Sequence, residues 1–213
     1  MPAATNTATK PTRGAGRPVG SNKEASLARI LPAARKLFAE LGYTKTTFKE
    51  VGKAVGMTHA ALYAYFPSKA TLYQATCDHT QSLLLTDYIA AIQGKPTLRE
   101  QLREILLVGV EAHNKDPSIT GLLGAIPMEI RRHPELAELL LDRQNATLQL
   151  LAKAFAAAQQ RGEITDKASP EDQVIAIMGA AVGISLLNSG LGSSDVMDSM
   201  QVFIDLIEAR FFQ

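Results

Sequence analysis

The sequence predicts an all-α fold with a small N-terminal domain and a larger C-terminal domain. Apolar residues recur at spacings of three and four along most of the chain, which is the period of one face of an α-helix. Residues that start helices, such as Thr47, Ser68 and Ser169, precede these segments, and glycines such as Gly42 and Gly162 follow them. The sequence shows no convincing alternation of the kind that marks strands, so we expect helices only.

The composition is that of a folded, water-soluble protein. The chain has 213 residues, 46% of them hydrophobic and 20% charged. Its one cysteine, Cys77, excludes an intramolecular disulfide and a cysteine metal cluster, and the N-terminus lacks the apolar core of a secretion signal. The longest apolar run, 174–187, is shorter than the roughly 18 residues of a membrane span, so it predicts a buried helix. We therefore expect a cytoplasmic protein with no membrane partner.

Charge is distributed unevenly along the chain. Residues 1–77 carry 11 lysines and arginines and only three acidic residues, whereas residues 78–213 carry 11 basic and 18 acidic residues. A basic segment of this kind is typical of a surface that meets a polyanion, although a chance distribution of solvated charges gives the same count.

Residues 1–22 form a predicted flexible basic arm, because they are rich in Ala, Thr, Pro and Gly and contain no acidic residue. Within the arm, Gly16-Arg17-Pro18 resembles the centre of an AT-hook, and Arg13 lies four residues upstream. An arginine on an extended segment suits the narrow minor groove of A/T-rich DNA, so Arg13 and Arg17 are candidate DNA contacts. The alternative is a solvated tail.

The predicted domain at 23–75 has the layout of a helix-turn-helix. A first helix runs to Gly42, starting near Pro32 or bending there. Thr47 and Glu50 form a capping box for a short helix that stops at Gly56, and Thr58 caps a second short helix that extends to about Phe66. A fourth helix follows Ser68 towards Gly94. In the two short helices a shared core is expected from Val51, Val55, Leu62 and Phe66, which leaves an outward face for the major groove made of His59, Ala60, Ala61 and Tyr63.

Residues 24 to about 75 closely resemble the DNA-binding domain of the tetracycline-repressor (TetR) family. The resemblance rests on many residues at fixed spacing: Arg29-Ile30-Leu31, Ala33-Ala34, Leu37-Phe38, Glu40, Gly42-Tyr43, Thr46-Thr47, Val55-Gly56-Met57-Thr58, Leu62-Tyr63, Tyr65-Phe66, Ser68-Lys69 and Leu72. It implies contacts with DNA by Thr46, Thr47, Lys49, Thr58, His59, Ala60, Ala61, Tyr63, Tyr65 and Lys69. The sequence departs from the common pattern at Ala60, where many members carry glycine. Tyr63 and Tyr65 are alternatively partly core residues, and His59 an ordinary exposed histidine.

Residues 76–213 form the predicted ligand-binding and dimerisation domain. We expect helices at about 96–113, from Pro117 with a kink at Pro127, from Pro134 to Arg161, from Ser169 to about Asn188, and from Ser194 to Phe211. The last two are apolar on several sides, and the resemblance implies that they pair with a second copy in a homodimer. The candidate interface residues are Ile175, Met178, Val182, Leu186, Met200, Phe203, Ile204 and Ile207. A monomer core is the alternative.

A cavity for a small molecule is expected among these helices. Polar or adaptable side chains on otherwise apolar helices are the candidate ligand contacts, namely Tyr88, His113, Met128 and Gln144, although most residues of this kind are ordinary core residues.

These features predict a sequence-specific transcription regulator that binds a palindromic operator as a dimer, in the form of a repressor released by a small-molecule effector. The alternatives are an activator and an architectural DNA-binding protein without a ligand. We do not expect an enzyme, a metal site or a cofactor, because the four histidines lack metal-ligand spacing and no phosphate-binding loop or nucleophile motif occurs.

Overall fold

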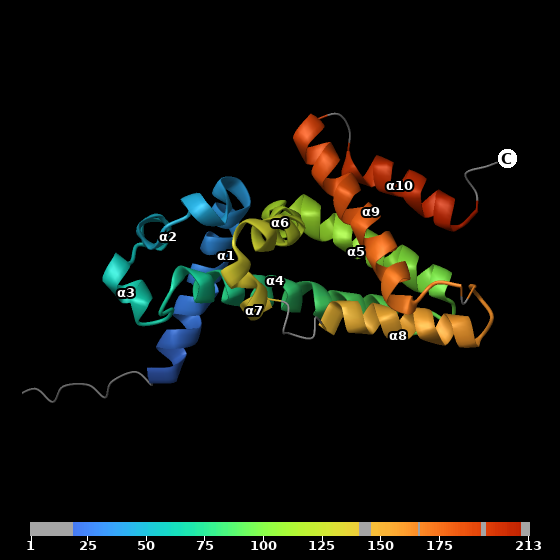
Figure 1. Ribbon diagram of the computed structural model, residues 1–213, viewed down its shortest axis with the longest axis horizontal. Helices are drawn as coiled ribbons and strands as arrows, with labels where there is room; N and C mark the ends of the chain where they lie inside the picture. The colour runs from blue at the N-terminus through green and yellow to red at the C-terminus, as the bar shows by residue number, and fades with distance from the viewer. Residues whose placement is uncertain (1–18, 141–145, 166, 193–194, 210–213) are drawn as a thin grey trace, which may run out of the picture.

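The computed structural model describes residues 19–140, 146–165, 167–192 and 195–209, and every regular element in these ranges is helical. The candidate arm residues Arg13 and Arg17 and the candidate ligand contact Gln144 lie outside them. The elements are α1 (Val19–Lys45), α2 (Phe48–Val55), α3 (His59–Tyr63), α4 (Lys69–Ile92), α5 (Leu98–Lys115), α6 (Ser118–Arg132), the short 3-10 helix η1 (Pro134–Leu136), α7 (Ala137–Leu140), α8 (Ala146–Gln160), α9 (Pro170–Leu191) and α10 (Val196–Ile207). Helices α2 and α3 lie at one end of the molecule and α8, α9 and α10 at the other (Figure 1).

One hydrophobic core holds α1, α2, α3 and the first half of α4 together. Val51 and Leu62 are fully buried in it, and Val55 and Phe66 are nearly so, as the sequence predicts. The core does not stop at the predicted boundary between residues 75 and 76. Side chains of the C-terminal segment, including Leu122 of α6, are buried in the same cluster. The two domains are therefore packed together rather than joined by a loose linker.

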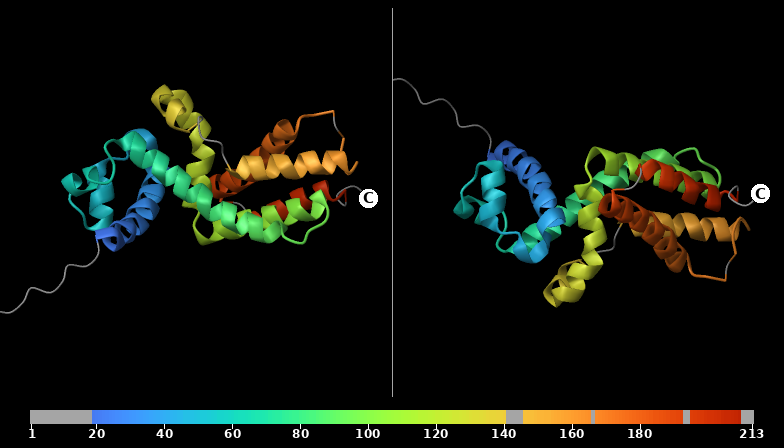
Figure 2. Two further views of the ribbon diagram at one scale, coloured as in Figure 1. Left: turned by 90° about the horizontal axis from the view of Figure 1, so that it is seen from below. Right: turned by 90° about the horizontal axis from the view of Figure 1, so that it is seen from above.

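A second and a third cluster of buried side chains lie in the C-terminal domain. The second half of α4 packs with α5 and α8 around residues such as Tyr88, Ile105 and Phe155, and α10 packs on α5 through Met200 and Ile204. The two views of Figure 2 show α4 running from the end that carries α3 into this helical layer. Helix α4 is thus shared by both domains.

Local capping signals fix most helix starts as predicted. Thr47 and Glu50 form a capping box, Thr58 caps α3, Ser68 caps α4 and Ser169 caps α9. Gly42 has a φ of 75° and interrupts the helical backbone of α1, which agrees with its predicted role as a helix end.

Three predicted boundaries are wrong. Helix α1 begins at Val19, inside the predicted arm, and α3 ends at Tyr63 rather than near Phe66. The single long helix expected from Pro134 to Arg161 is replaced by η1, α7 and α8, and Figure 2 shows α7 and α8 running in different directions. The reason is tertiary: Leu136 is buried in the N-terminal core, whereas Leu151 of α8 is buried in the C-terminal one.

Candidate DNA-binding surface and effector cavity

The turn between α2 and α3 is built for close approach of two backbone segments. A Cβ atom on Gly52 would lie 2.7 Å from the carbonyl oxygen of Met57, and the Met57 N–H donates to the Gly52 carbonyl at 2.9 Å. Gly56 caps α2 with a φ of 67°, in the left-handed region that favours glycine. The guanidinium of Arg29 donates to the Val55 carbonyl and ties α1 to this turn. The orientation of α3 relative to α2 is therefore fixed by short-range geometry.

The exposed face of α3 carries two small and two aromatic side chains. His59 and Ala60 are exposed, Ala61 is half-buried, and Tyr63 is 49% exposed. The Tyr63 ring meets the Phe48 ring edge-on at 4.6 Å between centroids and the His59 ring at 4.9 Å. This packing holds Tyr63 and His59 in place while leaving their polar atoms near solvent. The first turn of α3 is narrow enough to enter a major groove.

Two further candidates lie at the start of α2. Thr47 is exposed, and its hydroxyl and N–H both donate to the Glu50 carboxylate, at 3.1 and 2.8 Å. Lys49 is exposed beside it. A lysine at the start of a helix is suited to phosphate. Contact of Thr47 and Lys49 with DNA stays a prediction. Thr58, whose hydroxyl accepts from the Ala61 N–H at 3.1 Å, is likewise exposed at the start of α3.

Thr46 was predicted to contact DNA, but in this structure its side chain cannot do so. Its side chain is fully buried, and its hydroxyl is placed to donate to the carbonyls of Gly42, at 2.8 Å, and Leu37, at 3.1 Å. Its role is to close the end of α1 after Gly42. The sequence could not separate Thr46 from Thr47, because adjacent residues outside a helix do not reveal which one points inward.

Lys69 and Tyr65 lie differently from the simple expectation of phosphate contacts. The Lys69 ammonium donates to the carbonyls of Tyr43 and Thr44 at 2.8 and 3.0 Å and lies 4.4 Å above the Tyr43 ring. It therefore braces the segment after Gly42. Tyr65 is half-buried against the N-terminal core. A phosphate contact by either residue stays a prediction.

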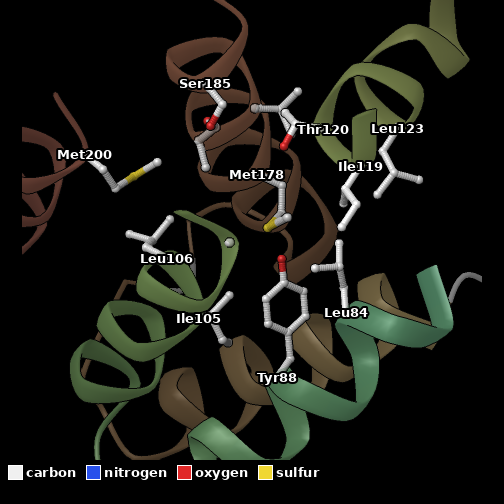
Figure 3. Close-up of a pocket in the computed structure, with 13 residues that line it drawn as sticks. Leu84, Tyr88, Ile105, Leu106, Ile119, Thr120, Leu123, Met178, Ser185 and Met200 are labelled. Atoms are coloured by element: carbon white, nitrogen blue, oxygen red, sulfur yellow. The ribbon is translucent and has the colours of Figure 1, made fainter. Parts of the chain in front are cut away.

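A small apolar cavity, here called the inner cavity, lies in the C-terminal domain. Its volume is about 70 Å³. Helices α4 and α5 contribute Leu84, Tyr88, Ile105, Leu106 and Gly109, and α6, α9 and α10 contribute Ile119, Thr120, Leu123, Met178, Ala181, Val182, Ser185 and Met200. Figure 3 shows the Tyr88 hydroxyl directed into the cavity towards Met178. Burial, assisted by the charge of Asp87, raises the pKa of Tyr88 to about 12, so the phenol keeps its proton as a hydrogen-bond donor.

A second, more open hollow, here called the outer cleft, lies between α1 and the C-terminal domain. Its volume is about 480 Å³. It is lined by Lys36, Ala39 and Glu40 of α1, by His113, Lys115, Asp116 and Pro117 at the end of α5, by Ser118 and Gly121 of α6, and by Leu186 and Ser189 of α9. It differs from the inner cavity in carrying charged side chains.

The predicted ligand contacts do not all lie in one hollow. Tyr88 lines the inner cavity and His113 lines the outer cleft. Met128 is 40% exposed and lines neither hollow, so its selection is corrected: on α6 it faces outward. Thr120 and Ser185 also line the inner cavity, but the sequence did not indicate them. A hydroxyl residue on an apolar helix occurs as often outside cavities as inside them.

Polar contacts join α1 to α5 and α6 beside these hollows. The Arg35 guanidinium is buried and pairs with Asp116 at 2.7 Å, and it also donates to the Ser118 hydroxyl at 3.1 Å. Burial alone would raise the pKa of Asp116, but hydrogen bonds from Ser118 and Arg35 outweigh it and lower that pKa. At the other end of α6, the buried Glu129 carboxylate accepts from the Tyr43 N–H at 3.2 Å. These contacts therefore connect both ends of α6 to α1.

Some apolar side chains of α9 and α10 pack inside the protomer, and others are exposed to solvent. Met200 and Ile204 are buried against α5, and Met178 and Val182 line the inner cavity, so these four predicted interface residues serve the protomer's own interior. Phe203 and Ile207 are partly buried there as well. Of the predicted set, Ile175 and Leu186 are exposed. Other large apolar side chains that the prediction missed are exposed with them, namely Leu187, Leu191, Val202 and Leu206.

Helix α9 has the length and the apolar composition of a membrane-spanning helix. Only 22% of its most apolar 18-residue stretch is buried inside the protein. Cβ atoms built on Gly179 and Gly183 would meet nothing within 4 Å. One such helix is weak evidence for a membrane span, and a second protein surface would cover the same face equally well. Among the described residues, no group of three or more His, Cys, Asp or Glu side chains is placed to hold a metal ion.

Residues 30–76, which include α2, α3 and the buried part of α1, match the family model described as "Bacterial regulatory proteins, tetR family". This segment of the chain is therefore a DNA-binding domain of the tetR type. The matched segment is the helix-turn-helix domain whose geometry is described above, and the remainder of the chain is not covered by that model.

Two curated proteins are similar to parts of this chain. The nucleoid occlusion factor SlmA of Haemophilus influenzae is 32% identical over 87 residues, which are 41% of this chain and 40% of that protein. The HTH-type transcriptional regulator UidR of Escherichia coli is 29% identical over 137 residues, which are 64% of this chain and 68% of UidR. The chain thus spans less than half the length of the SlmA relative.

The fold of most of the chain is found in a solved structure. The transcriptional regulator FadR from Bacillus subtilis in complex with stearoyl-CoA is 18% identical, with a TM-score of 0.73 over 86% of this chain and 98% of that one. At this identity the likeness concerns the fold, and it extends through the C-terminal helices that the family model does not cover.

Proposed function

We propose that this protein is a cytoplasmic, dimeric transcription repressor that leaves its operator when a small molecule occupies the inner cavity. The observation that carries the proposal is the exposed, small-residue face of α3, held rigidly by the Gly52 turn and connected to a cavity through α6. The tetR-type DNA-binding domain and the regulator names of the relatives support it.

DNA recognition is assigned to the first turn of α3. Ala60 and Ala61 let the helix backbone approach the floor of the major groove and offer methyl groups to thymine. His59 offers a hydrogen-bonding side chain on this turn, and the exposure of Tyr63 and Lys49 supports phosphate contacts by both. The protein's relatives include FadR, a transcriptional regulator with the same fold.

The effector is expected to enlarge the inner cavity. Small-molecule sites commonly have volumes of about 300–1,000 Å³, so a ligand of ordinary size needs more room than the 70 Å³ of the inner cavity. Expansion would displace α6, because Ile119, Thr120 and Leu123 form one wall. A ligand shifts the balance between two states only by binding them with different affinity, and a state with a wider cavity would bind it more tightly.

The displacement of α6 has a direct route to the DNA-binding domain. A Cβ on Gly121 of α6 would lie 3.2 Å from the Ala39 Cβ of α1, so the two helices are already in close contact. The Arg35–Asp116 pair and the Tyr43–Glu129 hydrogen bond act at either side of that contact. Movement of α6 would therefore rotate α1 together with α2 and α3.

A homodimer is proposed through the exposed apolar face of α9 and α10. A dimer with twofold symmetry presents two α3 helices to successive major grooves, about 34 Å apart along the DNA. The exposed leucines and unfilled glycine positions of α9 allow a second helix to pack closely on it.

The proposal is tested by selecting duplexes from a random pool with the full-length protein at moderate salt and sequencing those retained. We expect a palindrome whose half-sites are about one helical turn apart. Retention without a shared motif, by well-folded protein, would instead support an architectural DNA-binding protein and overturn the proposed function. An effector that leaves DNA affinity unchanged while bound in the inner cavity would remove the switching mechanism alone.

A further inference from the structure

The inner cavity and the outer cleft lie one helical turn apart along two helices. Gly109 lines the inner cavity, and His113, four residues later on α5, lines the outer cleft. Ser185 and Ser189 of α9 have the same relation. Because residues i and i+4 lie above one another on the same helix face, residues that line the outer cleft follow residues that line the inner cavity along α5 and α9.

A hydrogen bond between His113 and Ser189 joins the two helices at this step. The distance from His113 Nε2 to Ser189 Oγ is 3.2 Å, and the Ser189 hydroxyl also donates to the Ser185 carbonyl at 3.0 Å. Since a hydroxyl has one proton, Ser189 accepts from the imidazole, and Nε2 carries the imidazole proton. Nδ1 is therefore a hydrogen-bond acceptor.

The acceptor at His113 has no partner. Nδ1 is buried and makes no hydrogen bond among the described residues, and the His113 side chain as a whole is 5% exposed. Burial lowers the pKa of His113, so the ring is neutral at neutral pH and keeps this acceptor. A buried polar atom without a partner is unfavourable, and a hydrogen-bond donor brought by a ligand would satisfy it.

The charges around the outer cleft are balanced. Asp116 is paired with Arg35, and Lys115 is paired with Glu111 at 2.7 Å. The remaining charges on the lining, Lys36 and Glu40, have opposite sign. The cleft thus has no excess of either charge, which favours an uncharged polar group over an anionic or cationic one.

We propose that His113 and Ser189 form a gate between the inner cavity and the outer cleft, and that the effector is an uncharged amphiphile that passes this gate. Its alkyl part occupies the inner cavity, and its hydroxyl or amide N–H donates to His113 Nδ1. The inference rests on the proposed function in taking the inner cavity as the effector site. Joined through the open gate, the two hollows provide the volume that the inner cavity lacks.

The test uses full-length protein carrying [methyl-¹³C]methionine. Met178 and Met200 line the inner cavity, and Met57, in the turn before α3, is a distant reference. The probes are 1-hexanol and 1-methoxyhexane, which share the alkyl chain but differ in the ability to donate a hydrogen bond. We expect 1-hexanol to shift the Met178 and Met200 resonances, and 1-methoxyhexane to bind about three- to tenfold more weakly, the range for one net hydrogen bond.

Two substitutions examine the gate itself. His113→Phe keeps an aromatic ring but removes Nδ1, so it should abolish the difference between the two probes. Ser189→Ala releases the imidazole from α9, so it should accelerate 1-hexanol exchange several-fold, as measured from line shapes. Ser82→Ala on the exposed face of α4 is the matched control and should change neither result. If His113→Phe does not fold, the probe comparison and Ser189→Ala still decide the matter.

Equal affinity for the two probes, 1-hexanol shifts confined to methionines outside the inner cavity, or unchanged exchange in Ser189→Ala would overturn the gate. These outcomes are separable from failure of the proposed function. A protein that selects a palindromic duplex but treats both probes alike remains a regulator without this gate. A protein that binds 1-hexanol as expected but retains no duplex has the gate and is not a regulator.

Discussion

Single side chains hold the segment between α1 and α2 from two directions. Thr46 closes it from the interior through its bonds to the Gly42 and Leu37 carbonyls, and Lys69 closes it from α4 through the Tyr43 and Thr44 carbonyls. These residues hold the segment that leads into α2, and α2 supports α3. Their contribution to DNA binding is therefore positional.

Thr46→Val should destabilise the protein by about 0.5–1.5 kcal/mol, because an isosteric apolar side chain removes the buried hydroxyl that donates to these carbonyls. The measurement is the free energy of unfolding in urea. Thr86→Val is the control, since Thr86 is exposed on α4 and bonds only the Ser82 carbonyl of its own helix. A stability of Thr46→Val equal to that of wild type, with weaker DNA binding, would restore Thr46 as a DNA contact.

Tyr63 combines a structural ring with a free hydroxyl. Tyr63→Phe preserves the ring contacts with Phe48 and His59, so stability should not change, while loss of a hydrogen bond to phosphate should weaken operator binding about three- to tenfold. Fluorescence anisotropy with a selected duplex measures the affinity. Wild-type affinity in this variant would assign Tyr63 to packing alone.

At the scale of elements, the turn between α2 and α3 is the most constrained segment of the DNA-binding domain. Gly52 lies inside a helix, where glycine is normally unfavourable relative to alanine. Its presence is explained by the Met57 carbonyl, which occupies the space that a Cβ would need. The angle between α2 and α3 therefore depends on Gly52.

Gly52→Ala should therefore lower stability by about 1–3 kcal/mol through displacement of the Met57 backbone, and DNA binding should weaken with it. Gly109→Ala is the matched helical control, because its Cβ would make only an ordinary 3.7 Å contact with the Tyr88 hydroxyl. The control should be stabilised slightly by the better helix propensity of alanine. Thermal unfolding of both variants gives the comparison, and equal effects of the two substitutions would disprove the account of the turn.

The element scale also shows what the sequence could and could not predict. The caps at Thr47, Thr58 and Ser68 were predictable, because a cap is a contact between residues three apart in the chain. The division of 134–161 into η1, α7 and α8 was not, because it follows from burial of Leu136 and Leu151 in different cores. Among the site residues, the face of α3 followed from helix periodicity, whereas the inward direction of Thr46 depended on the distant carbonyl of Leu37.

The whole molecule places a DNA-binding end and an apolar end at opposite extremes, with α4 and α6 between them (Figures 1 and 2). The two helices predicted to form a dimer face, α9 and α10, do expose large apolar side chains, but several of these are not the residues that were predicted. Met200 and Ile204 fill the protomer, and Leu187 and Leu191 are exposed instead. Periodicity cannot distinguish these sides when a helix is apolar all round.

Leu187→Glu should convert the dimer to a monomer, because a charge would be buried in the apolar contact. Sedimentation velocity at micromolar concentration measures the change, and operator affinity should fall in parallel. Leu148→Glu is the control, since Leu148 is an exposed leucine on another helix, α8. A wild-type protein that is monomeric, or a Leu187→Glu protein that stays dimeric, would contradict this interface.

The central claim is that the state of the inner cavity sets the affinity for DNA through α6, and filling the cavity by substitution tests it most directly. Gly109→Leu places a side chain in the inner cavity beside Tyr88, whereas Gly109→Ala leaves room. The measurement is the dissociation constant of each variant for the selected operator. The account predicts at least tenfold weaker binding for Gly109→Leu, within the usual range of coupling energies, and binding within about twofold of wild type for Gly109→Ala. A folded, dimeric Gly109→Leu protein with wild-type operator affinity would contradict it.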